Sequence, residues 1–232
     1  MIGRGWRFRR GRRRLARAYV RGEGVEVGAL NEPLRLPRGA RVRYVDRLGT
    51  AELRERFPEL AGERLAEVDV VEDGETLASI ASGSLDFVVA NHVIEHTEDP
   101  LAALAAWLRV LRTGGTCFVA VPDMRHTFDR YRDETTVEHV LRDHREGPAA
   151  SRPAHFEEWA ARVLGASDPA AEGRRLDAVG EEIHFHAWTR EGFAALLEAA
   201  RAELPVGFEV AALEPNRHEF IAILRRSSAG DL

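Results

Sequence analysis

The sequence predicts an α/β fold: a doubly wound, mostly parallel sheet with an antiparallel C-terminal strand and an inserted helical cap. Short, β-rich apolar runs alternate with helical patterns over the first half of the chain, as they do in parallel sheets. About residues 123–188 then break this alternation, and they are too long for an ordinary strand-to-helix loop. One more helical pattern and two strand-like runs complete the chain.

An arginine-rich segment begins the chain. Residues 1–22 carry nine arginines and no acid, and we expect them to form a basic leader ahead of a single domain over residues 23–232. We interpret the leader as a helix that packs on the acidic body through Trp6, Phe8, Leu15 and Tyr19. The alternatives are a patch that contacts an acidic surface, such as a membrane, RNA or an acidic partner, and a transit-peptide-like segment.

Five apolar runs are predicted to form the parallel strands. The run at residues 85–90 is almost continuously apolar between Gly83 and Asn91, as expected for a central strand covered on both faces. The run at residues 116–121 is entered through a Gly114–Gly115 turn. The earlier strands are expected at residues 25–29, 42–46 and 65–71.

Helix start signals separate and follow these strands. Asp99 is a predicted N-cap, and Pro100 occupies the first helical position before a face of regularly spaced leucines. Within the cap, Thr135 and Glu138 form a capping-box pattern. Further helices are expected from residues 151–153 and from Thr189, and closing strands over 208–213 and 219–224.

The composition excludes several classes of protein. With 232 residues, of which 44% are hydrophobic and 31% charged, the chain can bury a normal core. Its single cysteine, Cys117, excludes an internal disulfide and a Cys-rich metal site, and we expect it to be a buried strand residue. No apolar run approaches the roughly 20 residues that cross a bilayer. We therefore expect a cytoplasmic protein without a transmembrane segment.

Small and acidic residues mark the first strand-to-helix junction, where residues 24–32 read GVEVGALNE. Asp46 lies twenty residues after Glu26 and ends the next predicted strand, where a carboxylate can bind ribose hydroxyls. The Gly-x-Gly-x-x-Gly phosphate motif is absent, and Glu32 would repel a pyrophosphate. The pattern predicts a site for a ribosyl ligand without phosphates.

The order of these elements resembles that of the class I S-adenosylmethionine-dependent methyltransferases, a Rossmann-like family, over about residues 22–122. Glu26-Val27-Gly28 is similar to the acidic-x-Gly opening of the family's first motif, and the domain looks like the type-11 kind. Residues 84–96 are similar to the fourth strand and the segment beside the methyl group, and residues 111–123 to the flanks of the fifth strand. Leu30 departs from the motif, because it stands in place of the second glycine.

The resemblance implies a methyltransferase with S-adenosylmethionine as its cofactor. It places the ribose on Asp46 and the adenine amino group on Asp73. The implied cofactor-binding residues are Glu26, Gly28, Ala29, Asp46, Asp73, Gly74, Asn91 and His92. The protein would align an acceptor atom behind the methyl group and exclude water.

Histidines in and beside the cap are candidate general bases, because imidazole titrates near neutral pH. His184 and His186 alternate along an extended segment, so at most one should point into a given cleft; His126 is the third candidate. Residues after the fifth strand lie at the carboxyl edge of the sheet, where ligands bind. The substrate-binding candidates are Asp123, Arg125, His155 and Trp188.

The acceptor is expected to be a small hydroxylated metabolite or a glycan, methylated on oxygen. No nucleic-acid-binding signature is present. A non-catalytic S-adenosylmethionine-binding module is one alternative, favoured by Leu30 and Glu32. A NAD-dependent oxidoreductase is the other, because Asp46 fits a dinucleotide ribose equally well.

One motif competes with this interpretation. His92-Val93-Ile94-Glu95-His96 matches the H-x-x-E-H pattern of zinc hydrolases. Pro100 starts a new helix four residues later, which leaves little room for a zinc-binding helix. We predict no metal site; Asp123 with the cap histidines is the alternative.

Overall fold

The computed structural model describes residues 3–228, with their side chains from residue 10 onward. Seven strands form one sheet in the order β3-β2-β1-β4-β5-β7-β6. Neighbouring strands from β3 to β5 are parallel, whereas β7 is antiparallel to both β5 and β6. The predicted Rossmann-like α/β fold is therefore confirmed. The strands are β1 (Glu23–Val27), β2 (Arg41–Asp46), β3 (Val70–Val71), β4 (Leu85–Asn91), β5 (Leu111–Pro122), β6 (Phe208–Asn216) and β7 (Glu219–Arg226).

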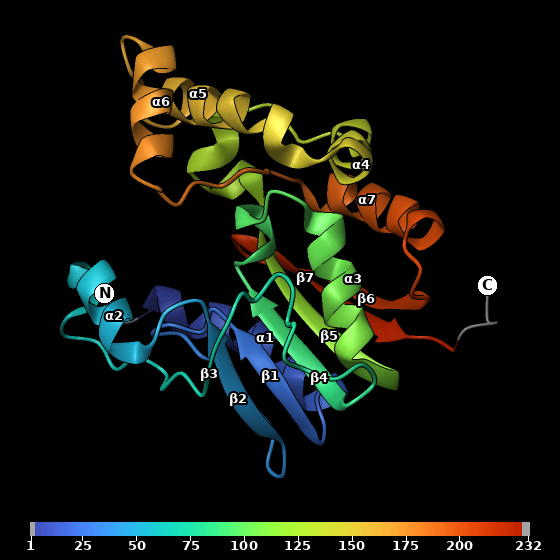
Figure 1. Cartoon of the computed structure of the whole chain (residues 1–232). Helices are drawn as coiled ribbons and strands as arrows, with labels where there is room; N and C mark the ends of the chain where they lie inside the picture. Colours follow the sequence, from blue (N-terminus) through green and yellow to red (C-terminus); the bar gives the residue numbers. More distant parts are fainter. Residues whose placement is uncertain (1–2, 229–232) are drawn as a thin grey trace.

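Helices cover both faces of the sheet and lie beyond its carboxyl edge (Figure 1). α1 packs on one face, and α3 and α7 on the other. α4, α5 and α6 belong to residues 123–188, which we call the cap. No helix within residues 3–228 is both long and apolar enough to cross a membrane. The helices are α1 (Gly3–Tyr19), α2 (Thr50–Arg56), α3 (Pro100–Val110), α4 (Val137–Glu146), α5 (Arg152–Arg162), α6 (Pro169–Ala178) and α7 (Arg190–Glu203), with 3₁₀ helices η1 (Pro58–Leu60), η2 (Ile94–His96), η3 (Met124–His126), η4 (Phe128–Tyr131) and η5 (Pro148–Ala150).

The central strand β4 is buried on both faces. Phe87 and Val89 pack in the apolar cluster under α1, whereas Val88 and Ala90 pack in the larger cluster under α3 and α7. Successive side chains of a strand point to opposite faces, so two covering layers require apolar residues at every position. This double burial explains the continuous apolar run in the sequence.

The arginine-rich start of the chain forms α1, whose inner side packs on the sheet. Leu15 and Ala16 are buried in an apolar cluster with residues of β4, β5 and β7, and Tyr19 packs at its edge. Trp6 and Phe8, which we expected in the same contact, lie outside the described side chains. The described half of this helix thus packs as the helical interpretation expects.

The third strand is shorter than the predicted run at residues 65–71. Only Val70 and Val71 pair with β2. Just before them, the carboxylate of Asp69 accepts a hydrogen bond from the backbone N–H of Tyr44 at 2.8 Å, so a side chain occupies the donor that a longer ladder would use. Regular pairing can therefore begin only at Val70.

The helix starts agree with the sequence except at α4 and α6, and α5 begins at Arg152 as expected. The side chain of Asp99 caps α3, and that of Thr189 caps α7, as predicted. α4 is capped by Thr136 instead of Thr135, because the hydroxyl of Thr135 accepts a hydrogen bond from the backbone N–H of Ala187. Helix α6 was not predicted, although Asp168 and the proline that follows it form the same start signal as at α3.

Candidate active site

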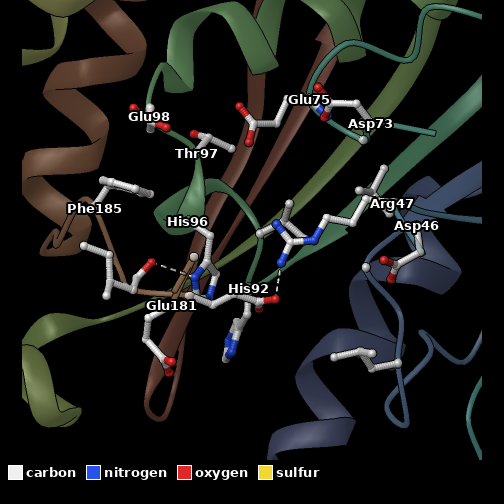
Figure 2. Close-up of a pocket in the computed structure, with 18 of the residues that line it drawn as sticks. Asp46, Arg47, Asp73, Glu75, His92, His96, Thr97, Glu98, Glu181 and Phe185 are labelled. Carbon is white, nitrogen blue, oxygen red and sulfur yellow. Dashed lines mark hydrogen bonds and ion pairs between the residues drawn. The ribbon is translucent and has the colours of Figure 1, made fainter. Parts of the chain in front are cut away.

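A cavity of about 580 Å³ lies at the carboxyl edge of the sheet, between the ends of β1, β2 and β4 and the cap. Open parallel sheets bind ligands at this edge. Figure 2 shows Asp46, Arg47 and Asp73 on one side and Phe185 of the cap on the other. The lining residues are Val27, Gly28, Leu30, Asp46, Arg47, Leu53, Phe57, Asp73, Gly74, Glu75, His92, Val93, His96, Thr97, Glu98, Arg152, Gly180, Glu181, Glu182, Ile183 and Phe185.

Acids from the ends of two strands line the sheet side of the cavity. Asp46 ends β2, and partial burial raises its pKa. Asp73 follows β3, and its Oδ1 accepts a hydrogen bond from the Glu75 backbone N–H at 2.9 Å. Burial, followed by the charge of Asp73, raises the pKa of Glu75 to about 7. Sequence reasoning missed Glu75, although it lies two residues after the matched aspartate.

Two glycines and one leucine shape the floor of the cavity. A Cβ at Gly74 would lie 2.2 Å from Val27 Cγ1, so no larger residue fits there without movement. Gly28 has a φ of +63°, which favours glycine. Leu30 has a φ of +44° although it carries a side chain, and it lines the cavity. The departure from the family motif therefore lies on the cavity wall.

The other predicted cofactor residues lie outside the cavity lining. Glu26 is fully buried, and its two carboxylate oxygens accept from the Leu34 backbone N–H at 2.9 and 3.0 Å. The amide of Asn91 donates to Glu26 at 3.0 Å. Burial raises the pKa of Glu26 to about 7. Glu26 and Asn91 thus support the junction from beneath, and Ala29 is likewise absent from the lining residues.

His92 connects the cavity wall to the first helix. Its Nε2 lies 2.7 Å from Glu219 Oε2 on β7. Glu219 is buried, and its carboxylate also accepts hydrogen bonds from Nε and Nη2 of Arg12, at 3.0 and 2.6 Å. The hydrogen bonds from His92 and Arg12 lower the pKa of Glu219 against the effect of its burial. The arginine-rich helix therefore helps to hold a residue of the cavity wall.

Three titratable side chains meet beside the cavity, and we call them the pocket cluster: Glu95, His96 and His184. His96 Nδ1 lies 2.8 Å from the Ile183 carbonyl oxygen, to which it can only donate, so Nε2 is its acceptor nitrogen. The ring of His184 meets that of His96 edge-on at 4.7 Å, and its Nδ1 lies 2.8 Å from Asp129 Oδ2. Neither carboxylate oxygen of the buried Glu95 has a hydrogen-bond partner.

This pocket cluster can accept a proton or hold a cation. Burial lowers the pKa of His96, which keeps its imidazole neutral at neutral pH. One donor atom from each of the three residues lies within 4.8 Å of the others, a spacing that also suits a divalent ion. Sequence reasoning selected His184 but missed Glu95 and His96 as a pair, because their nearness to residue 184 depends on the path of the cap.

His184 and His186 point to different places, as their alternation predicts. His184 joins the pocket cluster, whereas His186 is fully buried on the other side of its segment and stacks on Trp188 at 5.2 Å. His186 and Trp188 are absent from the cavity lining. An extended backbone cannot turn both histidines into one cleft.

The remaining candidates also lie away from the cavity lining. Asp123 pairs with Arg125 at 2.6 Å, so each neutralises the other near the surface. His126 is exposed, and His155 contacts a second histidine inside the cap. Cys117 is buried in β5, as expected, and burial raises the pKa of its thiol.

The H-x-x-E-H motif does not form a zinc-binding helix. His92 has a φ of +55°, and only Ile94–His96 form a short 3₁₀ turn. His92 contacts Glu219, whereas His96 contacts the carbonyl of Ile183. The two histidines therefore do not share a helical face, and the zinc-hydrolase alternative has no support from this geometry.

The sequence comparison finds one related family. Residues 24–119 match a family model described as a methyltransferase domain. The match covers less than half of the chain and shows that this segment is similar to that family. The cofactor that the match implies is S-adenosylmethionine, and the strand-end acids and glycine floor of the cavity fit that group. No curated protein sequence matches significantly.

Solved structures are similar to this chain at low sequence identity, and the first two below share its fold. A chain of the complex between the Haloferax volcanii Trm112 methyltransferase activator and the putative methyltransferase is 15% identical, with a TM-score of 0.55 over 98% of this chain and 92% of that one. A Rhodobacter sphaeroides protein described as a putative Zn-dependent alcohol dehydrogenase is 15% identical, with a TM-score of 0.51 over 90% and 86%. The CurJ carbon methyltransferase is 14% identical, with a TM-score of 0.49 over 90% of this chain, which spans only 49% of that protein.

Proposed function

We propose that the protein is an S-adenosylmethionine-dependent methyltransferase that transfers a methyl group to an oxygen of a small hydroxylated metabolite or of a glycan. The observation that carries the proposal is that His96, with an acceptor nitrogen and a lowered pKa, lines the same cavity as Asp46 and Asp73. A hydroxyl acceptor must lose its proton as its oxygen is methylated, and a neutral imidazole is suited to take it. S-adenosylmethionine supplies a methyl group already activated by its sulfonium.

The sheet side of the cavity would hold the cofactor. Asp46 would bind the ribose hydroxyls, and Asp73 the adenine amino group. Gly28 and Gly74 would leave room for the backbone to approach the ligand. His92, held by Glu219, would lie beside the methyl group.

The cap side would hold the acceptor and remove its proton. His96 Nε2 would accept the hydroxyl proton, while Ile183 keeps the opposite nitrogen protonated. The unpartnered carboxylate of Glu95 would stabilise the imidazolium that forms. His184, oriented by Asp129, would act as a positioning residue behind His96. The cap as a whole would select the acceptor.

Calorimetric titration with S-adenosylhomocysteine, beside NADH, tests the cofactor half. Asp46→Asn should weaken S-adenosylhomocysteine binding at least tenfold, because it removes the charge that accepts from ribose hydroxyls. Asp133→Asn, the same change at an exposed cap position, should leave the affinity unchanged. Binding of NADH in preference to S-adenosylhomocysteine would contradict the assignment.

Turnover of labelled S-adenosylmethionine with a panel of hydroxylated acceptors tests the acceptor half. His96→Asn should lower kcat by about 10²-fold or more with little loss of cofactor affinity. Burial lowers the pKa of His96. The midpoint of the acid limb of the wild-type kcat/KM profile against pH should therefore lie below 6.5, the ordinary pKa of histidine. His218→Asn, the same change on the exposed β6–β7 turn, is the control and should keep full activity. Full activity of His96→Asn as well would show that the general base is another residue.

A further inference from the structure

Three histidines from separate elements meet inside the cap, away from the cavity lining. His139 lies on α4, His155 on α5, and His186 in the segment before α7. One ligand atom from each lies within 4.8 Å of the other two. Asp143, one turn after His139, brings its Oδ2 to 3.2 Å from His139 Nε2. We call these four residues the cap tetrad.

Two distances within the cap tetrad are close to those of a tetrahedral ligand set. His139 Nε2 lies 3.0 Å from His155 Nε2 and 3.2 Å from Asp143 Oδ2. Four ligands at about 2.0–2.1 Å from a tetrahedral zinc ion lie roughly 3.3 Å from one another. Without a metal, one proton can be shared between His139 Nε2 and His155 Nε2. That proton provides no hydrogen-bond donor for His186 Nδ1 or Asp143 Oδ2.

The unsatisfied atoms of the cap tetrad are deeply buried. His186 is fully buried, and its Nδ1 has no hydrogen-bond partner. Asp143 is also buried, and its Oδ2 makes no hydrogen bond of good geometry. Buried polar atoms nearly always have a partner, so two such atoms beside two further ligand atoms point to a missing positive centre.

Other residues contact the atoms of the tetrad that face away from its centre. Ser151 Oγ donates to Asp143 Oδ1 at 2.6 Å, which leaves Oδ2 for the centre of the cluster. His186 Nε2 lies 3.5 Å from the Glu98 carbonyl oxygen. Metal-binding histidines usually have such a partner on the ring nitrogen that does not face the metal.

We propose that His139, His155, His186 and Asp143 bind a zinc ion that joins α4, α5 and the segment before α7. Imidazole nitrogens and one carboxylate suit zinc, whereas magnesium and calcium prefer oxygen ligands. Four protein ligands leave no open position, so the ion has a structural role. It fixes the segment that carries His184, without entering the cavity.

One contact of the cap tetrad must change when the ion binds. Zinc at His139 Nε2 requires a proton on Nδ1, so the exposed Arg142, now 2.7 Å from that nitrogen, must turn away when the ion binds.

Metal titration of the full chain tests the proposal. Chelator-treated wild-type protein should bind one zinc ion per chain, and cobalt(II) should give the visible absorption of a tetrahedral site. His155→Asn and Asp143→Asn should each weaken zinc binding at least 100-fold. His218→Asn makes the same change on the exposed β6–β7 turn and should bind zinc as the wild type does.

His96→Asn distinguishes the cap tetrad from the pocket cluster. It should retain stoichiometric zinc, since His96 belongs only to the pocket cluster. Loss of zinc in His96→Asn but not in His155→Asn would place the ion at the pocket cluster and overturn the proposal. This assay measures no methyl transfer, so its outcome is independent of the proposed function.

Thermal unfolding of the wild type keeps the test decisive if the variants fold poorly. Zinc at 100 times its Kd should raise the Tm by about 5–10 °C, because it binds the folded chain alone. Magnesium at the same concentration should leave the Tm unchanged. No shift with zinc, or equal shifts with both ions, would contradict a zinc site in the cap.

Discussion

At Leu30 the backbone adopts a conformation that a glycine would adopt without strain. Its φ of +44° lies in the left-handed region, which is unfavourable by about 1–2 kcal/mol for a residue with a Cβ. Its side chain also lines the cavity at the floor. The surrounding fold thus holds the backbone at Leu30 in a conformation typical of glycine, although a leucine disfavours that conformation.

Leu30→Gly should increase the affinity for S-adenosylhomocysteine several-fold, on the order of 1 kcal/mol, because the cavity floor widens. Calorimetric titration measures the change. Arg217→Gly is the matched control, since it relaxes a φ of +66° in the β6–β7 turn away from the cavity. Weaker binding in Leu30→Gly would mean that the leucine contacts the cofactor.

Glu26 links folding stability to pH. Burial raises its pKa to about 7 in the folded protein, above its ordinary value of 4.5. The folded state therefore binds this proton more tightly than the unfolded chain does. Its contribution to stability is fully present below pH 4.5 and is lost as the pH rises to about 7, by at most roughly 3 kcal/mol.

Glu26→Gln should remove this part of the pH dependence, because the amide does not titrate. Urea unfolding between pH 4.5 and 8 measures it as the difference between wild type and variant. The exposed Glu63→Gln should follow the wild-type curve. If the free energy of unfolding of Glu26→Gln depended on pH as that of the wild type does, the pKa of Glu26 would not be raised in the folded protein.

At the scale of elements, the sequence predicted the strands and helix starts that depend on neighbouring residues alone. Continuous apolar runs located β4 and β5, and the side chains of Asp99 and Thr189 cap the helices they were expected to start. Contacts between distant segments decided the rest. The Asp69 carboxylate accepts from the Tyr44 backbone N–H, which limits the pairing of β3. The Thr135 hydroxyl accepts from the Ala187 backbone N–H and is therefore not available to cap α4.

Asp99→Ala should lower the free energy of unfolding by about 1–2 kcal/mol, because it removes the acceptor for the Ala102 backbone N–H. Chemical unfolding monitored by circular dichroism measures this loss. Asp99→Asn keeps an acceptor oxygen and should stay within about 0.5 kcal/mol of the wild type. Equal losses in both variants would assign the effect to the ion pair of Asp99 with His144 instead.

At the scale of the molecule, the two sides of the cavity differ in how far the sequence could predict them. The acids and glycines of the sheet side follow strand ends, and the ends of parallel strands lie at one edge whatever the loops do. The cap side depends on packing, since Asp129 and His184 are 55 residues apart in the chain. No local pattern could show that His96 meets His184, or that His186 turns toward His139 and His155.

Arg12→Met should destabilise the protein by about 3–5 kcal/mol, because it removes a buried charge that neutralises Glu219. Urea unfolding measures the loss. Arg14→Met, two residues further along α1, breaks the exposed pair with Glu214 and should change stability by at most about 1 kcal/mol. Similar effects of both variants would show that burial adds nothing to the Arg12 pair.

The pairing of Arg12 with Glu219 also constrains when the protein can fold during its synthesis. The two residues are separated by 207 positions, and the apolar side of α1 packs on β7 as well as on β4 and β5. α1 therefore leaves the ribosome well before β7, the strand whose Glu219 neutralises its arginine. Until β7 is made, Leu15 and Ala16 lack part of the surface that buries them, and this apolar side of α1 makes the nascent chain prone to aggregation.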